Sequence, residues 1–151
     1  DFGSYREEVA REGASLGIEI FSIHVDRTED LPAILRREMR DMDAFWLPPD
    51  PLLITQENLI ILREFSWANG IPFYGSTKGM TREGAAASIG LSFREMGAAA
   101  AAAALKLEAG ETLEPVIFPE NTEVTLNGTS ATKCRLEFPR KIIEEAGYLF
   151  P

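Results

Sequence analysis

The sequence predicts a doubly wound α/β fold with a mainly parallel sheet. Short apolar segments rich in β-branched and aromatic residues alternate with helical patterns of about 10–15 residues. Glycine or proline separates most helical patterns from the apolar segment that follows. No fixed-period repeat and no flexible linker interrupts the alternation. We therefore expect a Rossmann-like arrangement in which helices cover both faces of one sheet.

The amino-terminal part predicts a helix, a strand and a second helix. Residues 4–15 mix apolar and charged side chains at helical spacing, and Gly17 marks the end of that helix. Residues 18–25 are dense in β-branched and aromatic side chains, as in a buried strand. Thr28 offers a helix cap ahead of acidic residues and an early proline, and the helix is expected to run through residues 33–42.

The middle of the chain continues the alternation. Residues 44–47 predict a short strand that ends at Pro48-Pro49-Asp50-Pro51. Helical spacing begins at Thr55, runs through Ala68 and ends at Gly70. The elements expected next are a strand at 71–74, a turn at 75–79, a helical turn at 81–83 and a strand at 85–89.

The last third departs from this pattern. Residues 92–109 predict a strong helix with seven consecutive alanines, which ends at Gly110. Extended segments are expected at 114–126 and 132–136 around an Asn127-Gly128 turn. Asn127-Gly128-Thr129 also matches a glycosylation acceptor, although Asn-Gly turns occur for backbone reasons alone. A terminal helix is expected at 140–146, closed by Gly147.

Composition excludes several classes of protein. The chain of 151 residues is 45% hydrophobic and 26% charged, as in a folded globular protein. A formal net charge of -9 argues against nucleic acid and against an anionic membrane surface as partners. Cys134 is the only cysteine, which excludes an internal disulfide and a multi-cysteine zinc site. The chain starts in charged, helix-like sequence without a signal peptide, so we expect it to begin within a longer protein.

No established catalytic motif is present. The sequence lacks a phosphate-binding glycine-rich loop, a zinc-protease motif and a hydrolase nucleophile motif. His24 is the only histidine, and no second acid–base group is identifiable beside it. Cys134 is interpreted as a small buried apolar residue, and the acidic residues near Asp26 lack the spacing of a metal-binding loop. We therefore expect no enzymatic activity, no metal and no cofactor.

Three loops lie where ligands bind in parallel sheets, beyond the carboxyl ends of the strands, at 48–54, 75–80 and 90–93. Asp50 supplies a carboxylate for a ligand ammonium, or else caps a turn. Ser76 and Thr77 offer hydroxyl and backbone N–H groups for a carboxylate or another small anion, or else form a polar turn without a ligand.

Five blocks of sequence occur in a specific order: 43–51 (DAFWLPPDP), 70–76 (GIPFYGS), 83–90 (EGAAASIG), 93–97 (FREMG) and 136–151 (LEFPRKIIEEAGYLFP). Together they resemble the second half of the ABC-transporter substrate-binding proteins that include tryptophan- and tyrosine-binding members. The last block is similar to the closing strand and helix of that family. The resemblance spans nearly the whole chain.

The resemblance implies a periplasmic-binding-protein fold of the first type, in which two Rossmann-like lobes joined by three crossings close on a small ligand. Residues 1–90 and 119–151 would form the second, carboxyl-terminal lobe. Residues 91–118 would form crossings and an alanine-rich helix that packs on the first lobe. An isolated piece would leave that helix uncovered, so a homodimer through residues 92–109 is a further expectation.

Position by position, the resemblance assigns ligand binding to Pro49, Asp50, Ser76, Thr77 and Gly90. The family often has an aromatic side chain where this chain has Ile89, so stacking on an aromatic ligand lacks support here. Lys78 adds a positive charge beside the site, which favours an anionic ligand or only faces water.

The resemblance thus implies a solute-binding component of an ABC importer that recognises a small polar organic ligand, with amino acids among the candidates. Its partner would be an ABC permease, reached through the full-length protein, and it would work in the periplasm or anchored at the outer face of the membrane. Two alternatives remain open. One is a sensor module of a signalling protein with the same fold. The other is a small flavodoxin-like enzyme, which the missing phosphate loop and acid–base pair disfavour.

Overall fold

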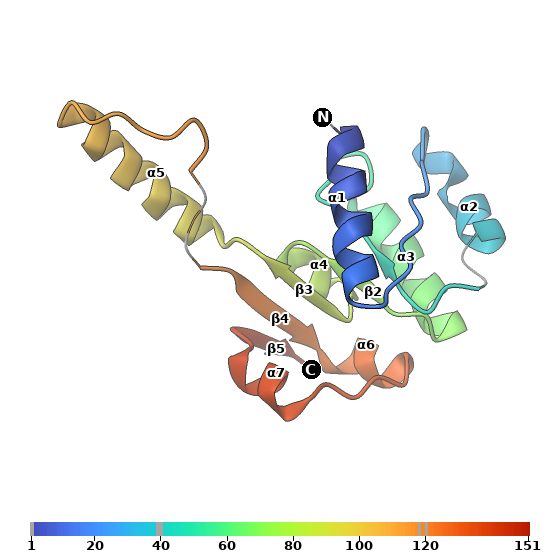
Figure 1. The fold of residues 1–151 in the computed structure, drawn as a ribbon. Coiled ribbons are helices and arrows are strands. Elements are labelled where there is room, and N and C mark those ends of the chain that lie inside the picture. The colour runs from blue at the N-terminus through green and yellow to red at the C-terminus, as the bar shows by residue number, and fades with distance from the viewer. Residues whose placement is uncertain (1, 39–40, 118, 120) are drawn as a thin grey trace. The chain divides into compact units, whose positions relative to one another are not determined.

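The computed structural model describes residues 2–38, 41–117, 119 and 121–151 (Figure 1). The chain divides into two compact units, Asp1–Met39 and Arg40–Pro151. Each unit has its own helices, and all the strands assigned in the described residues belong to the second unit.

The first unit begins with the expected helix, α1 (Phe2–Ser15), and Gly17 follows it with a positive φ of 73°. The strand predicted at 18–25 is wrong, because this segment carries no strand. A strand forms only when its backbone pairs with a neighbour, and the described part of this unit offers no second strand. Ile18 donates its backbone N–H to Gly13 instead, and the Phe21 side chain is 58% exposed.

The second helix of this unit starts differently from its prediction. Thr28 does not cap it; a 3₁₀ turn, η1 (Thr28–Asp30), precedes α2 (Leu31–Glu38). Leu31 and Leu35 lie one turn apart and are buried. The helix predicted to reach residue 42 has already ended by Asp41, while residues 39 and 40 lie outside the described part of the chain.

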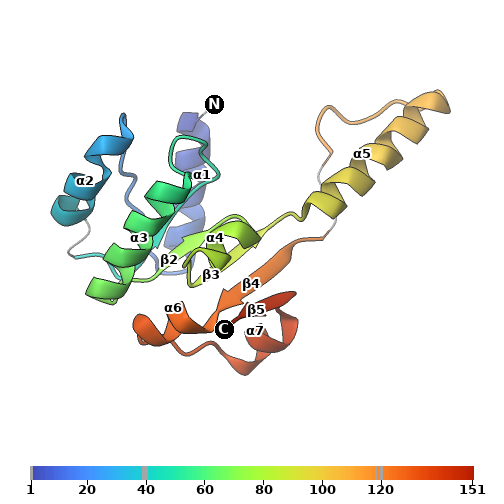
Figure 2. The same ribbon diagram turned by 180° about the vertical axis from the view of Figure 1, so that it is seen from behind.

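The second unit contains a five-stranded sheet in which the spatial order of the strands follows the chain. The strands labelled in Figure 2 lie in this order. The strands are β1 (Phe45–Trp46), β2 (Phe73–Gly75), β3 (Ala87–Gly90), β4 (Glu123–Asn127) and β5 (Tyr148–Phe150). β1, β2 and β3 run parallel, β4 is antiparallel to β3, and β5 is parallel to β4. This confirms the α/β class and the mainly parallel sheet.

Two helices between the parallel strands follow local signals. α3 (Gln56–Asn69) has Thr55 as its cap and ends at Gly70, whose φ is 66°, as expected. α4 (Lys78–Arg82) begins within the predicted turn, because the Thr77 side chain caps it by accepting from the N–H of Met80. α4 lies against β2, β3 and β4.

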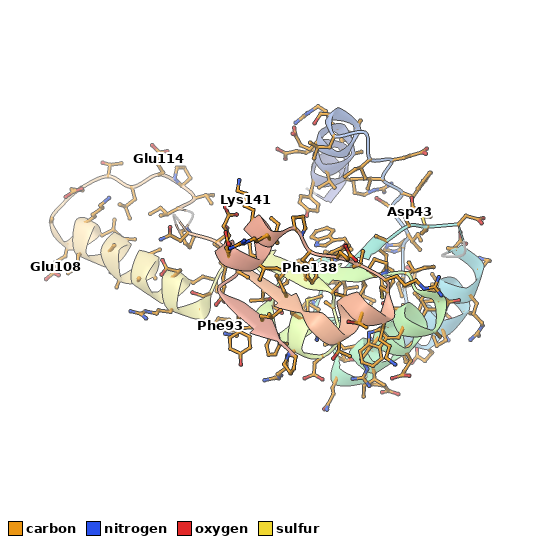
Figure 3. The ribbon with its side chains drawn as sticks, turned by 90° about the horizontal axis from the view of Figure 1, so that it is seen from below. Asp43, Phe93, Glu108, Glu114, Phe138 and Lys141 are labelled. Atoms are coloured by element: carbon orange, nitrogen blue, oxygen red, sulfur yellow. The ribbon has the colours of Figure 1, made fainter. Side chains whose placement is uncertain are left out.

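The long alanine-rich helix is confirmed as α5 (Phe93–Glu108), with Ser92 as its cap. None of its residues is buried. We call residues 91–122 the arm: α5 leaves the sheet after β3, and the chain returns to β4. Figure 3 shows Phe93 at the base of the arm, Glu108 near its far end and Glu114 on the segment that returns toward the sheet. In the return segment, residues 118 and 120 lie outside the described residues, and with them part of the expected crossing and of the domain boundary at 118–119.

Three predictions in the carboxyl-terminal part are wrong. Asn127-Gly128 is no hairpin turn, because the Asn127 side chain accepts from the N–H of Ser130 and caps α6 (Gly128–Lys133). Residues 132–136 therefore end a helix rather than forming an extended segment. The terminal helix is confirmed as α7 (Arg140–Glu145), but the closing strand follows it as β5 and is absent at Leu136-Glu137.

A chain of buried hydroxyl and amide groups joins β3 and β4 to α4 and α6. The hydroxyls of Ser88 and Thr125, paired across the two strands, lie 2.7 Å apart. Thr125 donates to the hydroxyl of Thr81, and the side-chain amide of Asn127 donates to the Thr81 carbonyl. Ser130 donates its hydroxyl to Gly84. Within the described residues every buried side-chain N or O atom has a hydrogen-bond partner. The hydrogen bonds of this network therefore compensate for the loss of water around its polar groups.

Candidate functional site

One edge of the sheet gathers the loops that the sequence singled out. Because β1, β2 and β3 are parallel, the segments that follow them, residues 48–54, 76–77 and 91–92, lie at the same edge. β4 runs antiparallel to β3, so β4 and β5 start at this edge with Glu123 and Tyr148. We call these segments and two starting residues the loop edge.

Asp50 caps a turn, as one of its two predicted roles requires, and its carboxylate is still exposed. Its Oδ1 accepts from the N–H of Leu52 at 2.8 Å, and its backbone carbonyl accepts from Leu53 and Ile54. Asp50 and its neighbour Pro49 are both exposed. The rigid turn therefore holds the carboxylate at the loop edge, where it is open to solvent.

Asn58 is a supporting residue that the sequence did not reveal. It lies on α3 and is 3% exposed, and its side-chain amide donates to the carbonyl of Leu52 at 3.0 Å. This bond ties the Asp50 turn to a helix. In the sequence, Asn58 is one of several polar residues of an amphipathic helix, and no local pattern distinguishes it from the others.

Ser76 and Thr77 follow β2 and are half-buried. The Thr77 hydroxyl oxygen accepts from the N–H of Met80 at 3.3 Å, so this side chain has a structural task as the cap of α4. The Ser76 hydroxyl lies 3.7 Å from the sulfur of Met80, a weak contact. The Thr77 hydroxyl therefore keeps its hydrogen for a bound group, and the Ser76 hydroxyl can exchange its weak bond to sulfur for a bond to such a group.

Gly90 and Ser76 are brought together, although they follow different strands. A Cβ placed on Gly90 would overlap the carbonyl oxygen of Ser76. The Asp50 loop follows the neighbouring strand β1, whose residue Trp46 is paired with Tyr74 of β2. The structure therefore places all five residues assigned from the sequence at one edge: four lie in loops that follow β1 and β2, and Gly90 is the last residue of β3.

Lys78 does not present an unpaired cation to this edge. Its ammonium lies 3.8 Å from a carboxylate oxygen of Glu123 and 4.0 Å from the centre of the Tyr148 ring. Both partners attract a positive charge. They come from β4 and β5, far along the chain, so only the sheet order brings them to Lys78 and local sequence offers no signal for them.

A shallow hollow of about 240 Å³ opens beside the starts of β4 and β5. Carboxylates and neutral polar groups dominate its lining, which consists of Ser92, Glu95, Asn121, Thr122, Glu123, Val124, Glu145 and Gly147. Such a lining favours groups that donate hydrogen bonds or carry positive charge.

Ile89 stands at the position where the resembling family often has an aromatic side chain. Its side chain is 60% exposed.

Tyr74 on β2 is the titratable group at this part of the sheet with a shifted pKa. Burial raises the pKa of its phenol above the ordinary value of 10.0, and the neighbouring Cys134 thiol raises it further. Cys134 itself is buried, and its sulfur lies 3.4 Å from the hydroxyl of Ser66. This matches its interpretation as a small core residue.

No group of three or more His, Cys, Asp or Glu side chains among the described residues is placed to hold a metal ion. Of the helices described, none is long and apolar enough to cross a membrane.

Comparison with known proteins gives one family. A family model described as ABC transporter substrate binding protein matches residues 5–149. No curated protein matches the chain.

Three solved structures share the fold. An ABC domain from Streptococcus pneumonia in complex with L-Trp is 19% identical with a TM-score of 0.76, and the match covers 98% of this chain and 50% of that one. A conserved domain protein from Vibrio cholerae is 17% identical with a TM-score of 0.75, covering 97% and 49%. A ligand-free, open substrate-binding protein with adhesive properties from Clostridium difficile is 18% identical with a TM-score of 0.73, covering 95% and 48%. This chain thus spans about half the length of each.

Proposed function

The chain belongs to the ABC transporter substrate-binding protein family, and on this premise we propose that it is one lobe of the solute-binding component of an ABC importer. Its role would be recognition and delivery of a solute to a permease, without catalysis. The working place of such a component is outside the cytoplasm, in the periplasm or anchored at the outer face of the membrane. The half-length match to solved binding proteins supports the two-lobed arrangement.

We further propose that the ligand is a small polar organic molecule of the amino-acid class. The Asp50 carboxylate would bind the ligand ammonium, and the hydroxyls of Ser76 and Thr77 would donate to its carboxylate. Pro49 and Gly90 would shape the surrounding backbone. The observation that carries this proposal is the parallel run of β1, β2 and β3, which delivers these loops to one edge. A similar structure that holds L-Trp supports the ligand class.

The division of the chain follows from the same proposal. Residues 1–90 and 119–151 would form the binding lobe, and residues 91–118 would cross to a companion lobe. α5 supports this, because none of its residues is buried against the rest of the chain. Ligand binding would then favour the closed arrangement of the two lobes, since only that arrangement contacts the ligand from both sides.

Calorimetry on the two-lobed protein tests the site. With L-tryptophan and the other common amino acids as probes, Asp50→Ala and Ser76→Ala should each weaken binding by about 1.5–3 kcal/mol, tenfold or more in Kd, because each removes a hydrogen bond to a charged group. Asp43→Ala is the matched control: Asp43 is also exposed, but it precedes β1 and therefore lies at the opposite edge. Unchanged affinity in the two site variants would refute the assignment.

A further inference from the structure

Two glycines flank the Ser76-Thr77 loop. Gly75 ends β2 and Gly90 ends β3. Neither has a positive φ, unlike Gly17, Gly70 and Gly84, so neither is needed for a left-handed backbone. The reason for glycine at positions 75 and 90 must be space.

The space beside each glycine is filled by a different kind of atom. A Cβ on Gly90 would overlap the Ser76 carbonyl oxygen and lie 3.0 Å from the carbonyl carbon. A Cβ on Gly75 would lie 2.9 Å from Cβ, 3.0 Å from Cε and 3.1 Å from Sδ of Met80, a side chain that is 1% exposed. The backbone of Ser76 leaves no room for a side chain at position 90, whereas at position 75 the obstacle is the partly flexible side chain of Met80.

The contacts continue into the loop. The Ser76 hydroxyl donates weakly to the Met80 sulfur, and the Met80 N–H donates to the Thr77 side chain. A shift of the Ser76 carbonyl would therefore move both hydroxyl-bearing residues and loosen the start of α4. The loop is held by close packing against the end of β3 on one side and Met80 on the other.

We infer that Gly90 is a positioning residue: it acts through the Ser76 carbonyl to fix the Ser76-Thr77 loop and does not itself contact the ligand. This inference rests on the proposed function, in which that loop faces the ligand. It changes the role assigned to Gly90 from the sequence, because the carbonyl of Ser76 already occupies the space beside its Cα. Any side chain at position 90 displaces the loop.

A graded series of glycine substitutions tests this inference in the two-lobed protein. Gly90→Ala meets backbone, Gly75→Ala meets Met80, and Gly79→Ala is the matched control, because a Cβ there would lie 3.7 Å from the Thr77 hydroxyl oxygen, an ordinary contact. The ¹³C-labelled Met80 methyl signal and the hydrogen exchange of the Met80 and Thr81 amides report loop position. Amide exchange should change most in Gly90→Ala, less in Gly75→Ala and least in Gly79→Ala. The Met80 methyl signal should shift in Gly75→Ala through direct contact and in Gly90→Ala through displacement of the loop, and it should stay unchanged in Gly79→Ala.

Affinity for each of the common L-amino acids, with L-tryptophan first, is the second measurement. Gly90→Ala should lose about tenfold or more, and Gly79→Ala should stay within about threefold of the unchanged protein. Global destabilisation would speed exchange along the whole chain and lower the thermal unfolding midpoint. A positioning role confines the change to residues 75–81 and the end of β3.

The outcomes separate the inference from the proposed function. If Gly90→Ala leaves the Met80 signal and the affinity unchanged, the positioning role is wrong. If the Met80 signal shifts while the affinity persists, Gly90 positions the loop but the loop does not bind the ligand, and the proposed site fails. A protein that binds none of the amino acids contradicts the ligand class alone, because the Met80 signal still decides whether Gly90 fixes the loop.

Discussion

The phenol of Tyr74 links the pH dependence of stability to the packing of β2. Its pKa is raised, first by burial and then by Cys134, so the folded state holds the phenol proton more tightly than the unfolded chain does. The stabilisation from this group is complete below pH 10.0, the ordinary value, and is lost as the pH rises through the folded-state pKa.

We therefore predict that the unchanged protein loses more stability than Tyr74→Phe between pH 8 and pH 11. Urea unfolding midpoints at both pH values measure the difference in stability. A titration followed by the absorbance of ionised tyrosine should contain one transition above pH 10.0 in the unchanged protein that is absent in Tyr74→Phe. Tyr5→Phe, on the exposed side of α1, controls for the loss of a phenol as such. Equal losses in the unchanged protein and Tyr74→Phe would contradict this prediction.

At the residue scale, local chemistry was predictable and distant partners were not. Asp50 and Thr77 lie in loops whose polar character is visible in the sequence. Asp50 caps a turn, which is one of its two predicted roles, and Thr77 caps the helix α4. The partners of Lys78 depend on sheet order, which no local pattern encodes. Capping by Asn127 was missed because Asn-Gly also fits a hairpin turn, and only the following helix decides between them.

Among the elements, β4 and α6 depend on one buried amide. Asn127 is 6% exposed, caps α6 and donates to the Thr81 carbonyl of α4. Asn127→Ala should lower the free energy of unfolding by about 1–3 kcal/mol, because it leaves a buried carbonyl and an N–H without partners. Urea unfolding monitored by circular dichroism measures the loss.

Asn69→Ala is the control for that prediction, because Asn69 is an exposed amide on α3 that donates to Phe65 within the same helix. The two variants should differ clearly, and equal losses would count against the network. Burial also argues against the glycosylation reading of Asn127-Gly128-Thr129, since a sugar cannot be attached to a side chain enclosed in this network.

Elements with strong local signals were predictable, and those that need a distant neighbour were not. α3 and α5 have side-chain caps and glycine ends, and both were confirmed. Residues 18–25 have the composition of a strand but no pairing strand in the described part of their unit. β5 is an exposed edge strand of three residues, too short for its alternation to be distinguished from the terminal helix beside it.

At the scale of the whole molecule, the arm exposes an apolar helix face. Gly97, Ala101, Ala104 and Leu105 repeat at helical spacing on α5 and are all exposed. Small side chains let another backbone approach closely. In the two-lobed protein, the companion lobe is proposed to cover this face; in the isolated chain, a second copy is proposed to do so.

We predict that the isolated chain dimerises at high concentration and that the two-lobed protein stays monomeric. Light scattering over a concentration series measures both. Ala101→Glu should lower the dimer fraction of the isolated chain, because dimerisation would bury an unpaired charge. Lys106→Ala, a change at a polar position of the same helix, should leave it unaffected. A monomeric mass of the isolated chain at every concentration would contradict dimerisation through α5.

The pairing of Gly90 with Glu123 places the two ends of the arm side by side in the sheet, about 5 Å apart. An insertion whose ends meet can be lengthened, shortened or replaced without changing the register of the strands that hold it. The segment between β3 and β4 therefore starts and ends at neighbouring positions of the sheet. We expect relatives to diverge in what this lobe docks against while the loops that follow β1 and β2 keep their conformation.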